Sequence, residues 1–277
     1  MELYDKTCLK MSKVTTRAYS TSFSLGVRMV APKYRDDIYA IYGFVRLADE
    51  IVDSFLDYNQ SNLFYRFREE TYRALNEGIS TNPILQSFQL VANRCGIDRE
   101  LIDAFLNSME TDLQKKDYNS NEISDYIYGS AEVVGLMCLK VFYSDDADGY
   151  ESLKYPARKL GEAFQKVNFL RDIRADYQQL GRTYFPGVDF TNFTEEAKER
   201  IEKDIQHDFN EAYKGIVALK SGARLGVYLA YRYYLQLFKK IKRANAREVA
   251  KQRYRISNLT KATLLAKSYL RDQIGIV

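Results

Sequence analysis

Histidine, cysteine and tryptophan are scarce or absent in this chain, and each shortage narrows the chemistry open to it. The 277 residues contain no Trp, one His and three Cys. Because Ser-His-Asp and Cys-His mechanisms need an imidazole, either would have to use His207. The cysteines are odd in number and stand singly in helical contexts, so we expect reduced thiols and neither a disulfide nor a metal site at Cys8, Cys95 and Cys138.

Long apolar runs are also missing. No stretch approaches the roughly 20 apolar residues that cross a bilayer, and residues 1–6 lack the hydrophobic segment of a signal peptide. Together with reduced cysteines, this predicts a cytoplasmic protein. The formal net charge is only +4, with Lys and Arg spread over most of the chain, so nothing indicates a nucleic-acid partner.

The abundant features are aromatic side chains and helical periodicity. The 23 Tyr and 15 Phe suit a long apolar cavity with hydroxyl groups at its rim. Alternating β patterns are lacking, and the four prolines stand where helical patterns are expected to begin or end. We therefore predict an all-α fold, a single domain over residues 1–277, with a break at residues 21–26. Helices are expected at residues 3–20, 34–56, 62–77, 83–95, 99–115, 121–142, 150–177, 194–219, 222–243 and 257–271.

Two pairs of aspartates carry the strongest chemical signal: Asp49 with Asp53, and Asp172 with Asp176. A four-residue spacing on a helix puts both side chains on one face, with Cβ atoms roughly 5–6 Å apart. Both pairs stand among apolar residues, so their helices are expected to be buried, and buried carboxylates need cationic partners. Such pairs suit Mg²⁺ bound jointly by carboxylates and substrate phosphates. Two facing pairs would clamp a diphosphate.

The neighbours of these aspartates favour this interpretation over that of ordinary helix-surface carboxylates. Arg46 precedes Asp49 by three residues. Amide and guanidinium groups along an apolar helix are hard to explain by packing alone, and three of them lead toward Asp172 at three-residue steps: Gln165, Asn168 and Arg171. An amide oxygen can ligate a metal, and a guanidinium group can bind phosphate through two hydrogen bonds.

A third aspartate pair has the same spacing in a different setting. Asp204 and Asp208 lie in a stretch crowded with Glu, Lys and Arg. We interpret that stretch as a solvated helix face, with His207 on it. The pair therefore serves as a control for the spacing argument.

Five segments resemble, in order, the motifs of the squalene and phytoene synthase family, the head-to-head prenyl diphosphate synthases. The resemblance runs over residues 20–186; residues 187–277 match more loosely, through Tyr234 and the Ala244–Asn245 region. Arg174 and Ala175 replace the Gly-Glu usual in the second aspartate motif, which leaves both outer aspartates in place. The segments are Ser22–Ser24, Tyr39–Asp53, Tyr126–Gly135, Leu160–Asp176 and Gly181–Pro186.

The resemblance implies an isoprenoid-synthase-type helical bundle around a central cavity, with the aspartate pairs facing each other across its mouth. It implies catalytic roles for Tyr42 and Arg171 beside the four aspartates. The implied metal ligands are Asp49, Asp53, Asn168, Asp172 and Asp176. The implied substrate-binding residues are Ser22, Phe23, Val27, Arg46, Tyr128, Gln165, Asn168, Arg182 and Tyr234. Among these, Val27 is expected to stand near the floor of the cavity.

The implied function is that of a phytoene synthase, which joins two geranylgeranyl diphosphates with Mg²⁺, or alternatively Mn²⁺, and no NADPH. One alternative is a C30 synthase of the dehydrosqualene, hydroxysqualene or squalene type that uses farnesyl diphosphate. Another is a catalytically silent assembly subunit with the same fold. A basic run over residues 239–255 also suggests peripheral contact with anionic membranes. The oligomeric state stays open between monomer and homodimer.

Overall fold

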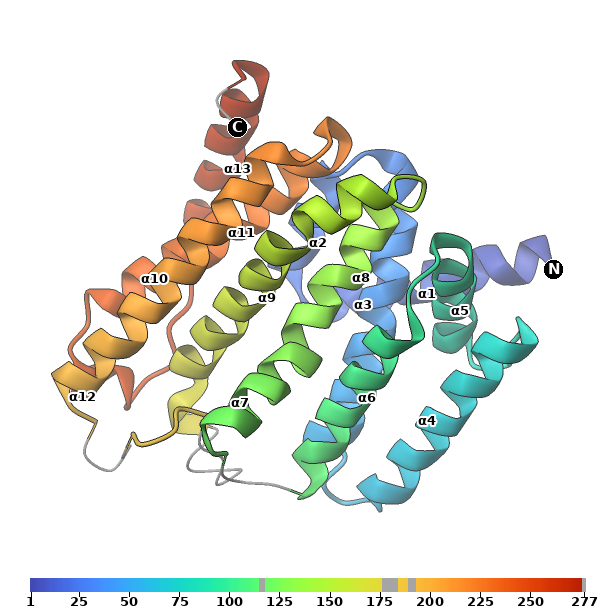
Figure 1. Ribbon diagram of the computed structural model, residues 1–277, viewed down its shortest axis with the longest axis horizontal. Helices are drawn as coiled ribbons and strands as arrows, with labels where there is room; N and C mark the ends of the chain where they lie inside the picture. Colours follow the sequence, from blue (N-terminus) through green and yellow to red (C-terminus); the bar gives the residue numbers. More distant parts are fainter. Residues whose placement is uncertain (115–117, 176–183, 189–192, 276–277) are drawn as a thin grey trace.

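The chain is all-α, as predicted. In the computed structural model, which describes residues 1–114, 118–175, 184–188 and 193–275, every regular element is a helix (Figure 1). No helix in these ranges is long and apolar enough to cross a membrane. The elements are α1 (Glu2–Tyr19), α2 (Thr21–Met29), α3 (Pro32–Asp53), α4 (Gln60–Glu77), α5 (Pro83–Cys95), α6 (Arg99–Gln114), α7 (Ser120–Ile127), the π-helical turn η1 (Tyr128–Glu132), α8 (Val133–Phe142), α9 (Ala147–Ala175), α10 (Glu195–Ala218), α11 (Ser221–Lys242), α12 (Ala246–Val249) and α13 (Asn258–Gln273).

Local signals explain where several helices begin and end. The Asn82 side chain accepts hydrogen bonds from the backbone N–H groups of Ile84 and Leu85, and Pro83 fills the first position of α5. These are the preferred residues for a helix start. Gly78 and Gly96 follow α4 and α5 with φ of 70° and 63°, a conformation that glycine adopts without steric cost. The predicted limits of α5 are therefore confirmed.

Two predictions about helix breaks are wrong. Residues 21–26 belong to α2, which begins because the Ser20 side chain accepts a hydrogen bond from the N–H of Phe23 at 3.2 Å. Pro156 lies inside α9 and does not end a helix. Its ring is accommodated by α10, where a Cβ atom added to Gly215 would lie 2.5 Å from the Pro156 side chain. A neighbouring helix without a side chain at this point makes room for the ring.

The predicted helix 121–142 is one run of helix interrupted by the π-helical turn η1. Two glycines allow close approaches around this turn. A Cβ atom on Gly129 would lie 2.5 Å from the carbonyl oxygen of Ala104 in α6, and one on Gly161 of α9 would lie 2.7 Å from that of Ala131. Both contacts are with backbone, so neither neighbour can move aside cheaply. The turn is thereby wedged between α6 and α9.

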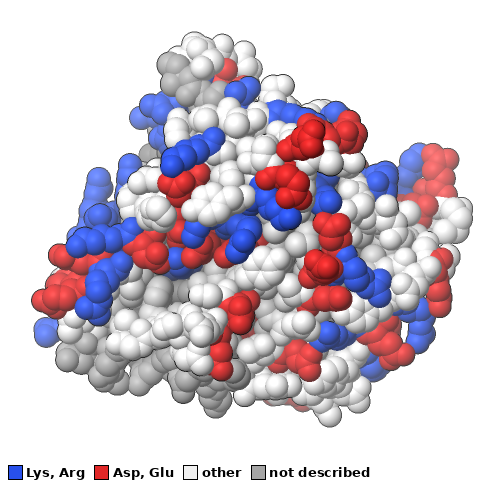
Figure 2. Space-filling model, viewed as in Figure 1, with Lys and Arg blue, Asp and Glu red and all other residues white. Residues whose placement is uncertain are grey.

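The buried apolar residues form two large clusters that share Val227 at their border. One lies mainly among α3, α5, α6 and α8, and the other among α9, α10 and α11. Figure 1 shows α3 and α9 running in the same direction down the molecule, so their C-terminal halves point to the same end. Acidic and basic side chains are interspersed over the face shown in Figure 2. Cys8, Cys95 and Cys138 are free thiols, as predicted.

Candidate active site

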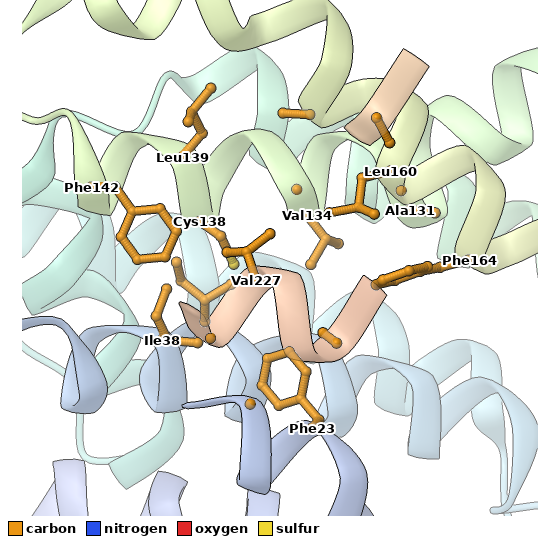
Figure 3. Close-up of a pocket in the computed structure, with 18 of the residues that line it drawn as sticks. Phe23, Ile38, Ala131, Val134, Cys138, Leu139, Phe142, Leu160, Phe164 and Val227 are labelled. Atoms are coloured by element: carbon orange, nitrogen blue, oxygen red, sulfur yellow. The ribbon is translucent and has the colours of Figure 1, made fainter. Parts of the chain in front are cut away.

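An apolar cavity of about 290 Å³ lies between the two hydrophobic clusters, near the lower end of the range typical of small-molecule sites. Residues of α2, α3, η1, α8, α9, α10 and α11 line it. Figure 3 shows Phe142 and Leu139 at one end and Phe164 at the other, with Cys138, Val134 and Val227 between them. The predicted central cavity is therefore present.

The few polar groups on the cavity wall gather toward the end marked by Phe164. The amide Nε2 of Gln165 donates to Ser130 Oγ across 3.4 Å. The Tyr42 ring stacks on Phe23, with ring centroids 4.6 Å apart, and burial raises the pKa of its hydroxyl group. Tyr234 stacks on Phe164 at 3.9 Å. Two aromatic rings, Phe23 and Phe164, and the hydroxyl groups of Tyr42 and Ser130 therefore border the apolar space at this end, while Tyr234 contacts Phe164 from outside the lining residues.

Helix α3 continues from Tyr42 to the first aspartate pair. Arg46 comes one turn after Tyr42, and its guanidinium group forms ion pairs with both Asp49 and Glu50. Its central carbon lies 4.3 Å from the ring centroid of Tyr19 in α1, close enough for a cation–π contact. The sequence analysis expected a cationic partner for the aspartates and noted that Arg46 precedes Asp49 by three residues, and the two side chains do form an ion pair. The parts played by Glu50 and Tyr19 were not predicted: Glu50 follows Arg46 by four residues and could have been found from that spacing, whereas Tyr19 lies on another helix and has no such signal.

Asp53 is the last residue of α3 and is half-buried. It follows Asp49 by four residues, so the two carboxylates share a helix face as expected. About 35% of the Asp49 side chain is exposed. A cation could therefore reach this carboxylate from solvent, whereas a phosphate group would need such a cation between itself and the carboxylate.

Helix α9 carries the second set of predicted site residues. The Asn168 amide donates a weak hydrogen bond of 3.5 Å to Gln165, while its own oxygen Oδ1 is buried without a hydrogen-bond partner among the described residues. Arg171 contacts Asp172 through Nη2 at 2.5 Å. Nε of Arg253 contacts the other oxygen of Asp172 at 2.7 Å. Sequence reasoning missed Arg253 at this site, because its place in the basic run was the only signal it carried.

The donor set suits a hard divalent cation, although the described residues do not by themselves complete a metal site. They contain no group of three or more His, Cys, Asp or Glu side chains placed to hold an ion. All the candidate ligands offer oxygen atoms, as Mg²⁺ prefers. The buried and unsatisfied Oδ1 of Asn168 is a group that a cation would satisfy. Asp176 and Arg182 lie outside the described residues.

The remaining predicted residues occupy different places. Val27 is 3% exposed and lines the cavity. Ser22 lies half-buried in the first turn of α2, one residue before Phe23. Tyr128 is not among the residues that line the cavity, because it packs beneath Arg158, whose guanidinium carbon lies 5.1 Å from the ring centroid.

The interpretation of Asp204 and Asp208 as a solvated face is wrong for Asp208. Its side chain is fully buried and contacts Lys166 Nζ at 2.7 Å and Lys159 Nζ at 3.1 Å. Asp204 is 58% exposed but also reaches Lys166. The local sequence is charged on every side, so it could not show that α10 packs this face against α9.

Comparisons with known proteins agree with this geometry. Residues 16–260 match the squalene/phytoene synthase family. The chain is 27% identical over 290 residues to the phytoene synthase of Arthrospira platensis, covering 96% of this chain and 93% of that one. It is 27% identical over 188 residues to the 4,4′-diapophytoene synthase of Staphylococcus haemolyticus, covering 67% of this chain and 65% of that one.

Solved structures show the same fold. The crystal structure of a dehydrosqualene synthase in complex with a ligand aligns with a TM-score of 0.81 at 22% identity, over 96% of this chain and 98% of that one. The squalene synthase HpnC from Alicyclobacillus acidocaldarius aligns with a TM-score of 0.75 at 20% identity, over 91% of this chain and 97% of that one. With residues 16–260 matched and the fold shared, the chain belongs to the squalene/phytoene synthase family of prenyltransferase-type enzymes.

Proposed function

We propose that this protein is a phytoene synthase, which condenses two geranylgeranyl diphosphates through their C1 atoms with the help of Mg²⁺. One observation carries the proposal: the central cavity is apolar along its length and polar only at the end from which α3 and α9 lead to Asp49 and Asp172. That arrangement suits a substrate with a hydrocarbon tail and a diphosphate head. The phytoene synthase of Arthrospira platensis, matched over nearly its whole length, supports the choice.

The proposed reaction has two halves. Loss of diphosphate from one substrate leaves an allylic cation, and the 2,3 double bond of the second substrate attacks it. Loss of a proton closes a cyclopropane ring and gives a cyclopropylcarbinyl diphosphate. That compound loses its own diphosphate, rearranges to a 1-1′ link and releases a proton to form the central double bond. No hydride is added, so NADPH is not required.

The residues of this chain hold, orient and shield the substrate. When bound, Mg²⁺ would neutralise the charge that develops on the departing diphosphate; Asp49, Asp53, Asn168 and Asp172 would hold it, together with Asp176. The guanidinium groups of Arg46, Arg171 and Arg253 already lie against these carboxylates, where they can also hydrogen-bond phosphate oxygens. The rings of Phe23, Tyr42, Phe164 and Tyr234 would exclude water from the cations and stabilise them through their faces.

A C30 product from farnesyl diphosphate is the second candidate. It is favoured by the similarity to the 4,4′-diapophytoene synthase of Staphylococcus haemolyticus and by the shared fold with a dehydrosqualene synthase. Both candidates place the diphosphates and the metal in the same way and differ only in how deep the tails reach. A silent assembly subunit would have no need for the unsatisfied Asn168 oxygen beside Asp172.

Mass analysis of the hydrocarbon made by purified protein from C15 or C20 diphosphate tests the proposal. We expect phytoene from the C20 substrate, release of pyrophosphate, and loss of both when Mg²⁺ is chelated. Asp49→Ala and Asp172→Ala should each remove most of the turnover with little change in melting temperature, because these carboxylates serve the ligand. Asp148→Ala, an exposed aspartate at the other end of α9, is the matched control. Full activity in either of the first two variants would refute the assignment.

A further inference from the structure

A second cavity, of about 310 Å³, lies on the other side of α11 from the central one. Val227 and Ala230 of α11 face the central cavity. Residues at three- and four-residue steps on the opposite stripe of the same helix, from Tyr228 to Lys239, line the second one. Helix α10 contributes Tyr213 to this second cavity, and α13 contributes Arg271.

Positive charge dominates the wall of this second cavity. Arg232, Lys239 and Arg271 line it, and no acidic residue does. In the described part of the chain, none of these three cations forms an ion pair with a carboxylate, whereas Lys159, Lys166 and Lys198 of neighbouring helices all do. Arg232 is half-buried, while Lys239 and Arg271 are exposed. Water screens part of the repulsion among these like charges, and the part that remains costs electrostatic free energy. A bound anion would remove that cost.

Three tyrosine hydroxyl groups add hydrogen-bond donors to the same space. The Tyr228 oxygen accepts from Arg232 Nη1 at 2.8 Å and from Arg271 Nη1 at 3.1 Å. Because a hydroxyl oxygen has two lone pairs and one hydrogen, the Tyr228 hydrogen is left to donate. No group among the described residues accepts a hydrogen bond from the hydroxyl group of Tyr228, Tyr213 or Tyr231. Burial raises the pKa of Tyr231 to about 12, so that group keeps its hydrogen at neutral pH.

We propose that this cavity binds a phosphate group. Its many N–H and O–H donors and its three cations, supplied by two helices, match an anion that carries several oxygens and more than one negative charge. Two sources have this chemistry: a free phosphate or pyrophosphate ion, and the head group of an anionic phospholipid. A neighbouring cavity lined by Lys240, Arg243 and Arg255 extends the positive surface along α11. The proposal does not depend on the proposed function, because the two cavities face opposite sides of α11.

Residue-resolved chemical labelling tests the site on the unmodified chain. Wild-type protein is treated with phenylglyoxal in EDTA, which removes metal-dependent binding at the central cavity, and the modified arginines are located by mass spectrometry. We expect pyrophosphate to slow the labelling of Arg232 and Arg271 severalfold. Arg200, an exposed arginine earlier in α10, should label at an unchanged rate.

Vesicles distinguish the two sources. If pyrophosphate in solution protects the two arginines from labelling, the ligand is a free ion. If only vesicles that contain phosphatidylglycerol protect them, and phosphatidylcholine vesicles do not, the ligand is a lipid head group. Arg232→Gln with Arg271→Gln should weaken the binding measured by calorimetry at least tenfold, while Arg200→Gln should not change it. Failure of both pyrophosphate and vesicles to protect the wild-type arginines, or equal protection of Arg200, would overturn the proposal.

Discussion

Lys166 is the centre of a buried charge network that holds α9 against α10, and replacing it tests how the aspartate-bearing helix is supported. Its Nζ lies 2.6 Å from Glu162, 2.5 Å from Asp204 and 2.7 Å from Asp208. The Lys166 side chain is 9% exposed and that of Asp208 is fully buried. In Lys166→Met, Asp208 would keep only the contact with Lys159.

The expected loss in the free energy of unfolding follows from the burial of these two side chains. Removing one partner of a buried ion pair typically costs about 3–5 kcal/mol, because the other charge stays buried. Lys159 remains 3.1 Å from Asp208 and offsets part of the loss, so we expect a decrease of about 3 kcal/mol in the free energy of unfolding. For a chain of this size the melting temperature should fall by roughly 6–12 °C.

Thermal unfolding followed by circular dichroism at 222 nm measures the effect. Lys154→Met is the control, because Lys154 forms an exposed ion pair with Glu151 on the same helix and should contribute less than about 1 kcal/mol. Adding Asp208→Asn to Lys166→Met removes the stranded charge and should restore part of the stability. A Lys166→Met protein that melts within 1 °C of wild type would refute the reasoning.

The same network predicts how stability depends on pH. Burial alone would raise the pKa of Glu162, but hydrogen bonds and charge from Lys159 and Lys166 outweigh it and lower that pKa below 4.5. A lowered carboxyl pKa stabilises the fold above the pKa of the unfolded chain and loses that contribution as pH falls through the folded value. Burial raises the pKa of Asp208, so in Lys166→Met this carboxyl takes up a proton more readily as pH falls and the penalty of its buried charge is relieved. Both effects act in the same direction, and we expect the gap in melting temperature between wild type and Lys166→Met to narrow as the pH falls from 7 toward 3. A gap that stays constant down to pH 3 would contradict this.

Three further outcomes follow from the cavity wall. Val27→Phe should shift selectivity from the C20 toward the C15 diphosphate about tenfold or more, since each methylene excluded from the cavity forfeits roughly 0.8 kcal/mol. Leu25→Phe is the control, because Leu25 lies on α2 but outside the cavity wall. An unchanged C20-to-C15 rate ratio in Val27→Phe would count against the role of Val27. Gly161→Ala should lower the free energy of unfolding by about 1–3 kcal/mol, because the new methyl group would lie 2.7 Å from the Ala131 carbonyl oxygen. An unchanged midpoint of chemical denaturation would contradict this prediction. Burial raises the pKa of the Cys138 thiol to about 12, so iodoacetamide at pH 8 should alkylate it at least about tenfold more slowly than free cysteine. Complete native-state modification on the time scale of the free thiol would be inconsistent with the structure.

Much of the candidate site was predictable because it depends on spacing along one helix. Asp49 and Asp53 share a face of α3 because residues four apart on an α-helix are separated by little more than one turn. Arg46 reaches Asp49 within one turn. The metal clamp across the two helices stays a prediction, since Asp176 lies outside the described residues.

The sequence by itself determined the all-α class, most of the helices and which residues share a helix face in α3 and α9, because caps, glycine stops and helical periodicity act within a few residues. Asn82, Pro83 and Gly96 set the limits of α5 in this way. The sequence did not determine α2 or the π-helical turn η1. Only the tertiary structure decided that Arg253 meets Asp172, that Asp208 is buried and that α11 has a cavity on each side. These depend on which helix packs against which, and such contacts join residues far apart in the chain, whose approach no local pattern encodes.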